Sequence, residues 1–210
     1  MASLRTCITL PVLVLCLCWP LAAWSQSAMD QMRHFYSNVD TFEAFFVQEL
    51  LDEDMQRMEL VEGTVWLSRP DRFRWEYSAP YEQVIVGDGE KIRMFDVELA
   101  QITVRPMDET LASTPAMLLA GGLELEERFR TDDLGRLGGH RWVELTPEVR
   151  DTDFRVVRLG FGDEGLVAME LIDSFDQTTR IRFARVKVNE GIDDSRFALE
   201  VPEGVDVVGE

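Results

Sequence analysis

One stretch, residues 63–104, constrains the fold of this chain more than any other. Within it, Arg72-Phe73-Arg74-Trp75-Glu76-Tyr77 alternates charged and aromatic side chains. A period of two is typical of a β-strand with one solvated face and one apolar face. Pro70 cannot donate a backbone hydrogen bond to a neighbouring strand, so it is expected to start this strand rather than lie inside it.

Other strands are predicted on both sides of this one. Gly63–Leu67 is expected to be its partner on the N-terminal side, and Gln83–Val86 follows it. Lys91–Phe95 comes next, after Gly87-Asp88-Gly89-Glu90, a sequence typical of a tight turn. Four short strands in succession predict an antiparallel meander with a large aromatic face.

The rest of the chain predicts more strands. They are expected at residues 42–48, 101–104, 141–147, 155–161, 167–172 and 178–188. In the last of these the alternation slips between Ala184 and Val186, which indicates a bulge or a bend. Residues 26–210 contain no internal repeat and no linker, so they are expected to form a single domain.

Two short helices are also predicted. Ala28–Ser37 carries an apolar stripe that includes Met32 and Phe35, and Thr114 and Pro115 suit the N-cap and first position of a helix that ends near Gly121. The first helix could cap a core or form part of a lid over a lipid site. The second is apolar throughout, so it must press on a surface, and ordinary core would serve.

Residues 1–25 resemble a secretory signal peptide. Arg5 precedes an apolar run from Ile8 to Trp19, and Ala23-Trp24-Ser25 resembles a cleavage site, so cleavage is expected near Ser25-Gln26. All three cysteines of the chain lie in this segment, so the mature protein is expected to have no disulfides and no thiol chemistry. It is also expected to be a soluble monomer.

Charge and motifs exclude several functions. The net charge of −18 repels nucleic acids and anionic membrane surfaces alike. The two histidines lie far apart in the sequence, and no nucleophile motif, metal-ligand spacing or phosphate-binding loop is present. We therefore expect neither an enzyme nor a metal or cofactor. The remaining feature that bears on function is the predicted apolar surface. An aromatic sheet face must be covered by helices, a second sheet or a ligand. A plain β-barrel core and a lipid-binding cavity both fit that pattern.

A family resemblance bears on this choice. The motif Gly63-x-Val65-Trp66-Leu67-x-Arg69-Pro70-x-x-Phe73-x-Trp75 is followed by Ile85-Val86-Gly87-Asp88-Gly89, Ser113–Leu119 and a more distant Phe197-x-x-x-Val201-Pro202-x-Gly204-Val205. In this order, these segments resemble the outer-membrane lipoprotein carrier (LolA) family. The resemblance implies a mainly β fold with a few short helices: an incomplete antiparallel β-barrel, closed by a helical lid over an apolar cavity.

The resemblance also implies a function. Members of the family are periplasmic carriers that take acylated lipoproteins from an ABC transporter in the inner membrane. They deliver this cargo to a lipoprotein receptor on the outer membrane. A lipid- or glycolipid-binding relative of the same fold, or a sensory module that binds a protein partner, stays open as an alternative.

The resemblance assigns roles to individual residues. Arg69 matches the arginine that holds the lid closed over the empty cavity, and residues 197–205 match the terminal strand region. The expected cavity residues are Phe46, Trp66, Phe73, Trp75, Val86 and Phe95. The expected lid-helix residues are Met32, Phe35, Pro115, Met117 and Leu118. The chain departs from the family at Arg72 and Arg74, where other members carry neutral residues.

Overall fold

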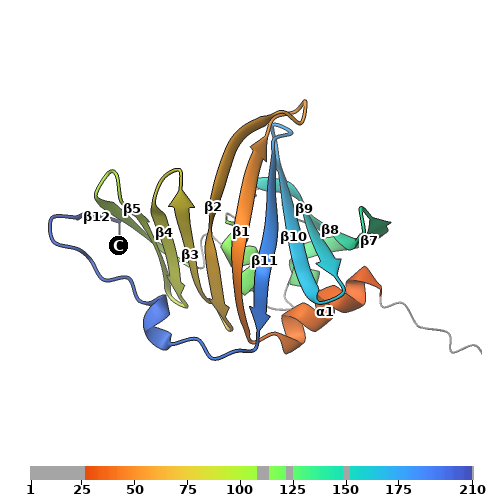
Figure 1. Ribbon diagram of the computed structural model, residues 1–210, viewed down its shortest axis with the longest axis horizontal. Helices are drawn as coiled ribbons and strands as arrows, with labels where there is room; N and C mark the ends of the chain where they lie inside the picture. Colours follow the sequence, from red (N-terminus) through yellow and green to blue (C-terminus); the bar gives the residue numbers. More distant parts are fainter. Residues whose placement is uncertain (1–26, 108–113, 122–124, 149–151, 210) are drawn as a thin grey trace, which may run out of the picture.

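The computed structural model describes residues 27–107, 114–121, 125–148 and 152–209. Its main feature is one sheet of twelve strands in the order β12-β6-β5-β4-β3-β2-β1-β11-β10-β9-β8-β7. All neighbouring strands run antiparallel except β12 and β6, which are parallel. The sheet curves strongly, and β12 and β7 lie at its two opposite edges (Figure 1). This open sheet is the incomplete barrel that the resemblance implied.

The first half of the chain forms one long helix and six strands. Their bounds are α1 Ala28–Asn38, β1 Thr41–Leu51, β2 Arg57–Ser68, β3 Arg72–Ala79, β4 Gln83–Asp88, β5 Lys91–Asp96 and β6 Gln101–Pro106. The predicted meander is confirmed, because β2 to β6 pair in sequence order. Pro70 lies in the turn before β3, and Gly89, with a φ of 98°, lies in the tight turn between β4 and β5.

The second half contains the short helices and the other edge of the sheet. Its elements are α2 Pro115–Ala120, α3 Leu125–Arg128, β7 Phe129–Leu137, β8 His140–Pro147, β9 Phe154–Gly162, β10 Gly165–Asp173, β11 Thr178–Val188, the 3-10 helix η2 Asp194–Phe197, and β12 Asp206–Val208. The predicted irregularity in β11 is confirmed. The β1–β11 register shifts opposite Arg185, which has a φ of 54°.

One element differs from the prediction, and some elements, among them the strand β7, were not predicted. Residues 197–205 were expected to form the terminal strand region, but η2 ends at Phe197 and the last strand begins only at Asp206. Pro202 lacks a donor, and Gly204 has a φ of 83°, so neither favours an extended ladder there. The edge strand β7 gave no sequence signal, because most of its side chains are exposed and do not alternate.

Two helices cover the inner face of the curved sheet. A capping box between Ser27 and Asp30 begins α1, which packs against β7 to β10, whereas α2 packs against β2 and β3. In Figure 1, α1 crosses the lower ends of the strands and α2, in green, lies behind them. Within the described ranges, no helix has the length and apolar character needed to cross a membrane. The predicted signal peptide and its cleavage site lie outside those ranges.

Candidate functional site

The inner face of the sheet carries a cluster of buried aromatic rings. Phe46, Phe73 and Trp75, all expected to line a cavity, are at most 1% exposed. The Phe46 and Trp75 ring centroids are 4.5 Å apart, and Phe183 extends the cluster at 6.4 Å from Trp75. The register explains the grouping, since Val65, Trp75 and Ile85 lie side by side on neighbouring strands.

Two glycines leave the space that these rings occupy. A Cβ atom on Gly87 would lie 2.7 Å from Cδ1 of Phe73, and one on Gly63 would lie 2.7 Å from Cζ of Phe46. Real Cβ atoms do not approach so closely, so each ring packs directly against a glycine of the neighbouring strand. The Gly63 and Gly87 of the sequence motif therefore determine the shape of the inner face.

Three residues predicted for the cavity lie on the opposite, outer face. Trp66 and Val86 are both paired with Arg74, the residue before Trp75. Phe95 is paired with Val84, which lies opposite Glu76, the residue after Trp75. Since directly paired residues share a face, the assignment of Trp66, Val86 and Phe95 to the cavity is wrong. The alternation that places Phe73 and Trp75 inside, combined with the strand register, would have excluded them.

The C-terminal segment covers part of that outer face. Arg72 pairs with Asp194 at 2.7 Å, and Nη1 of Arg74 donates to the carbonyls of Arg196 and Ala198 at 3.3 Å. The Arg196 guanidinium lies 4.6 Å from the centre of the Trp66 ring. Arg72 and Arg74 thus hold the C-terminal segment against the outer face, where η2 contacts β3 and β4 and Val86 of β4 is fully buried.

The first covering helix inserts its apolar stripe into the interior. Met32 and Phe35 are 1% and 3% exposed. The Phe35 ring makes edge-on contacts with Tyr36 and Phe42, with centroids 5.2 and 5.7 Å apart. Gln31 donates from Nε2 to the carbonyl of Gly162 at 2.9 Å, which attaches α1 to the end of β9.

The second covering helix is short and almost wholly buried. Thr114 caps it by accepting a hydrogen bond from the amide of Met117 at 3.3 Å, and Pro115 occupies the first helical position, as predicted. Met117 and Leu118 are each 1% exposed, whereas Pro115 is half-buried. Pro115 therefore starts the helix, and Met117 and Leu118 supply its apolar contacts.

Arg69 joins both helices to the sheet from the turn between β2 and β3. Its Nε donates to the carbonyl of Val39, the C-cap of α1, at 2.8 Å. Its Nη1 donates to the carbonyls of Ala120, at 3.0 Å, and Gly121 at the end of α2. The last carbonyls of a helix lack partners within the helix, so a guanidinium satisfies them well.

The surroundings of Arg69 are unusually apolar for a charged group. Its Cζ lies 5.0 Å from the ring centres of both Phe35 and Tyr36, and burial lowers the pKa of the guanidinium. Among the residues that the structure describes, no partner reaches its buried Nη2. The hydroxyl of Tyr36 donates to the carbonyl of Leu118 at 3.0 Å, which links the two helices directly.

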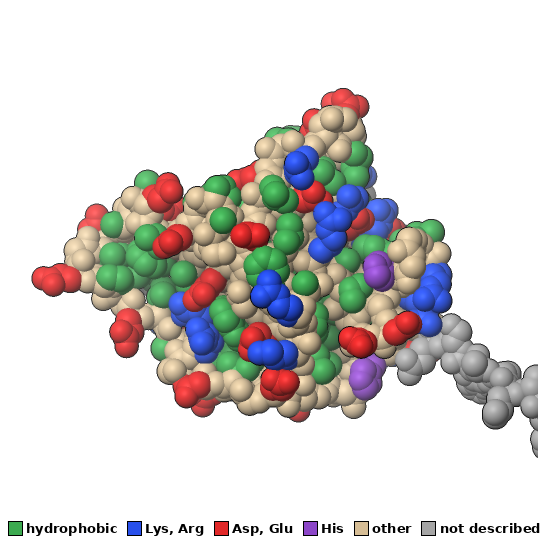
Figure 2. Space-filling model, viewed as in Figure 1, with side chains coloured by type: hydrophobic (Ala, Val, Ile, Leu, Met, Phe, Trp, Pro, Cys, Tyr) green, Lys and Arg blue, Asp and Glu red, His purple; other side chains and the backbone are tan. Residues whose placement is uncertain are grey.

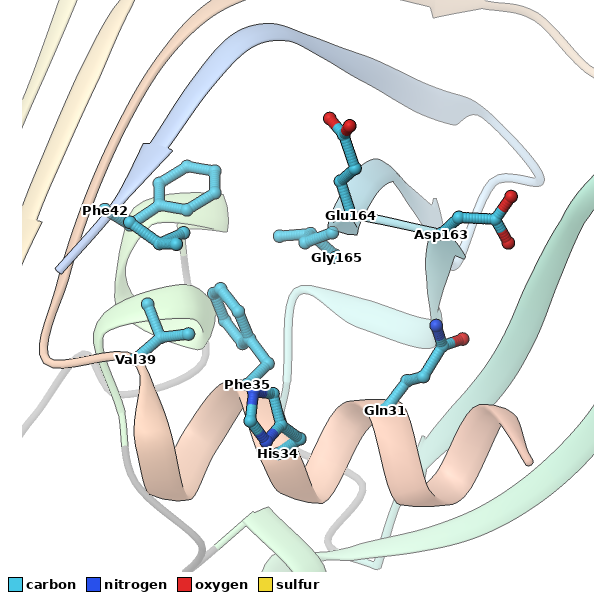
Figure 3. Close-up of a pocket in the computed structure, with 10 residues that line it drawn as sticks. Gln31, His34, Phe35, Val39, Phe42, Asp163, Glu164 and Gly165 are labelled. Carbon is cyan, nitrogen blue, oxygen red and sulfur yellow. The ribbon is translucent and has the colours of Figure 1, made fainter. Parts of the chain in front are cut away.

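A pocket of about 210 Å³ opens beside α1 (Figure 3). Phe35, Val39 and Phe42 form its apolar side, while Asp163 and Glu164 stand at the rim (Figure 3). The pocket is larger than the ~150 Å³ cavity that holds benzene. It is smaller than the ~300–1,000 Å³ usual for small-molecule sites. An acyl chain could enter fully only if the helices moved.

Among the described residues, no three His, Asp or Glu side chains gather closely enough to hold a metal ion. The geometry provides a largely apolar interior under two helices, and Arg69 attaches both helices to the sheet by hydrogen bonds to their backbone carbonyls.

Comparisons with known proteins agree with this arrangement. The family described as "Outer membrane lipoprotein carrier protein LolA" matches residues 37–200. An outer-membrane lipoprotein carrier protein of Dechloromonas aromatica is 43% identical over 191 residues, which cover 91% of each chain. One from Nitrosomonas europaea is 39% identical and covers 94% of this chain and 96% of its own.

A solved structure supports the fold independently. An uncharacterized conserved protein from Thermus thermophilus superimposes with a TM-score of 0.57 at 13% identity, covering 87% of this chain and 99% of its own. From the extent of the family match and the identity to these relatives, the chain belongs to the LolA family of outer-membrane lipoprotein carrier proteins.

Proposed function

We propose that this protein carries acylated lipoproteins across the periplasm. In this proposal it receives them from a lipoprotein-releasing ABC transporter in the inner membrane and delivers them to a receptor on the outer membrane. It shields their acyl chains between the sheet and the helices α1 and α2, and it performs no covalent chemistry itself. The names of its relatives support lipoproteins as the cargo. The apolar inner face of the sheet supports the proposal that the protein binds their acyl chains there.

The proposal answers a physical need. Each methylene transferred from a membrane to water costs about 0.8 kcal/mol, so a long acyl chain costs on the order of 10 kcal/mol. A free lipoprotein would therefore cross an aqueous compartment very slowly. A carrier must shield the chains and also release them, which limits how tightly it can bind.

One observation carries the proposal: a single side chain, Arg69, fastens both covering helices over an aromatic surface. Burying a guanidinium is costly, and its hydrogen bonds to the ends of both helices offset that cost only while the helices stay closed. In our proposal Arg69 is the latch of a lid. Cargo uptake breaks its hydrogen bonds, and their re-formation favours release.

The proposal includes a leader and a soluble mature form. Residues 1–25 would direct export and be removed near Ser25-Gln26, which leaves residues 26–210 as one monomeric domain in the periplasm. The intact mass of protein recovered from the periplasm checks this. A mass that includes residues 1–25, or an attached lipid, would contradict it.

The decisive experiment is release of a lipoprotein from spheroplasts. Purified mature protein is added to spheroplasts that synthesise one labelled outer-membrane lipoprotein, and the medium is assayed for a soluble complex of the two. Buffer and an unrelated acidic protein serve as controls. Release with the carrier alone supports the proposal. If the lipoprotein stays in the membrane with folded carrier present, the proposal is wrong.

A further inference from the structure

One buried hydrogen-bond donor on the inner face lacks a partner among the described residues. Nε1 of Trp75 can only donate, the residue is 1% exposed, and nothing in that part of the chain accepts its hydrogen. Buried donors are normally satisfied, because a donor that leaves water without gaining an acceptor destabilises the fold. An acceptor atom on a bound ligand would satisfy the indole of Trp75.

A second donor, the hydroxyl of Tyr77, lies beside the first. Tyr77 is two residues further along β3 on the same face, and its hydroxyl lies near the Trp75 indole without reaching hydrogen-bond geometry. It donates to Oε1 of Gln48 at 3.4 Å, a long contact that a better-placed acceptor could replace. Burial raises the pKa of Tyr77, so the hydroxyl keeps its proton at neutral pH. Two neighbouring donors suit one carbonyl oxygen, which has two lone pairs.

On one side of these donors lies a polar pocket. Tyr77 is paired with Gln83, and Gln83 with Asp96, so all three share the inner face of the sheet. A pocket of about 360 Å³ is lined by Tyr81, Glu82, Gln83, Asp96 and Glu98. The ring centroids of Tyr77 and Tyr81 are 6.1 Å apart, which places Tyr77 next to the pocket. Figure 1 shows the turn between β3 and β4 at the ends of the strands far from α1.

On the other side of the donors, aromatic rings lead to α1. Successive ring contacts, with centroids 4.5 to 6.4 Å apart, join Tyr77, Phe46, Trp75, Phe183, Phe42 and Phe35. Phe35 belongs to α1, so this series of rings spans the inner face from the polar pocket to the first covering helix. An acyl chain that lies on these rings would have its carbonyl end near Tyr77 and its methyl end beneath α1.

The charges at the polar end distinguish between kinds of acyl compound. Glu82, Asp96 and Glu98 line the pocket, and Glu59 lies beside Tyr81. Figure 2 shows acidic side chains at the upper left of the molecule, where Figure 1 places the β3–β4 and β5–β6 turns. These carboxylates repel the carboxylate of a fatty acid and the phosphate of a phospholipid. They do not repel the uncharged carbonyl of an ester or an amide.

We propose that Trp75 and Tyr77 bind the carbonyl oxygen of an uncharged acyl ester or amide, the group through which an acyl chain is joined to a lipoprotein. The inference rests on the proposed function, because α2 packs on β2 and β3 and has to move before a chain can reach these donors. The head of the ligand then lies in the pocket beside Tyr81, and the carbonyl contact sets how far the chain enters. Membrane phospholipids contain the same carbonyl group, but they also carry the phosphate that the pocket repels.

The test compares two lipids that differ only in the carbonyl group. They are 1-monolauroylglycerol, an ester, and 1-O-dodecylglycerol, the matching ether, both below the concentrations at which they form micelles. Binding to the mature protein is measured by displacement of the neutral fluorescent probe N-phenyl-1-naphthylamine. The variants are Trp75→Phe, Tyr77→Phe and the double variant. Trp142→Phe is the matched control, because Trp142 lies on β8 and its indole donates to the carbonyl of Leu137.

We expect the wild type to bind the ester at least about fivefold more tightly than the ether, as one net hydrogen bond provides. Each single variant should lower this ratio, and the double variant should bring it close to one, whereas Trp142→Phe should keep the wild-type ratio. Because the ratio is taken within one protein, a loss of stability affects both lipids alike. Equal wild-type affinities for ester and ether, or an unchanged ratio in the double variant, would overturn the inference.

Two further ligands distinguish the sources of the carbonyl group. An N-lauroyl peptide amide represents a lipoprotein, and lauroyl-lysophosphatidylglycerol represents a membrane phospholipid. We expect the peptide to bind more tightly, and tighter binding of the phospholipid would overturn the assignment to lipoproteins. If the protein releases lipoprotein from spheroplasts but does not distinguish ester from ether, the carbonyl site is refuted and the carrier role stands. If it prefers the ester but releases no lipoprotein, the carrier role is refuted and the carbonyl site stands.

Discussion

The hydroxyl of Tyr36, near the end of α1, donates a 3.0 Å hydrogen bond to the carbonyl of Leu118 in α2. The two helices pack on different halves of the sheet, and this buried bond joins them directly. Arg69 lies against the same tyrosine ring and bonds to the ends of both helices. We therefore expect α1 and α2 to open together rather than one at a time.

Replacing Arg69 by leucine should tighten the hold on cargo. Hydrogen bonds from a charged group contribute about 1.5–3 kcal/mol each, and in the proposed mechanism they stabilise only the closed, empty state. Their loss should increase cargo affinity about tenfold per 1.4 kcal/mol. Arg69→Leu should then take up lipoprotein from spheroplasts but transfer it poorly to the receptor. Arg69→Lys should be intermediate, because it retains the charge without the planar fork.

The opposite behaviour would refute the latch. A variant that fails at uptake but releases bound cargo at the normal rate would show that Arg69 stabilises the loaded state. Both steps can be followed in one assay by adding the receptor after the soluble complex has formed.

Tyr36→Phe should weaken the attachment of helices α1 and α2 less than Arg69→Leu does. It removes one buried hydrogen bond, worth about 1 kcal/mol, and keeps the ring against Arg69, so the opening equilibrium should rise roughly fivefold. Hydrogen exchange of the α2 amides measures this. Tyr77→Phe is the control, because its hydroxyl bonds to Gln48 in β1, away from the helices. Unchanged exchange in α2 for Tyr36→Phe would mean that the helices open independently.

The assignment of faces can be tested with single-tryptophan proteins. Residues 26–210 contain Trp66, Trp75 and Trp142. A protein that retains only Trp75, with phenylalanine at the other two positions, should be quenched by a spin-labelled fatty acid at micromolar concentrations. A protein that retains only Trp66 should not, because Trp66 lies on the outer face. Equal quenching of both would contradict an acyl-chain site on the inner face.

Gly87→Ala should destabilise the fold. Its Cβ would overlap the Phe73 ring, and such overpacking typically costs 1–3 kcal/mol. Gly191→Ala is the matched control, since no atom lies within 4 Å of its Cβ position. Urea unfolding of the two variants should give a lower midpoint for Gly87→Ala alone. A midpoint for Gly87→Ala equal to that of the control would show that the Phe73 ring can move aside.

Much of this fold was predictable because its signals are local. The alternation in β3, the turn at Gly89 and the capping residue Thr114 depend only on nearby residues. The phase slip in β11 likewise predicted the irregularity at Arg185. For Arg69 the motif gave the position, and the structure gave the three carbonyls that it contacts.

The errors arose where distant segments decide the outcome. Val86 is apolar and fully buried, yet it lies on the outer face beneath a segment more than a hundred residues later in the chain. Trp66 and Phe95 have the same ambiguity: an aromatic residue in a strand indicates burial without indicating on which side. The polar β7 is a strand only because β8 supplies its partner.

The C-terminal segment affects how the protein unfolds. Val86 and Phe197 are buried on the outer face, and the thickness of the sheet separates them from the aromatic cluster inside. Two apolar layers divided by a sheet can behave as separate cooperative units. The salt link between Arg72 and Asp194 and the Arg74 hydrogen bonds hold only the outer unit, which can detach while strands β3 and β4 stay paired. We therefore expect local unfolding at the back of the sheet to leave the position of the helices at the front unchanged.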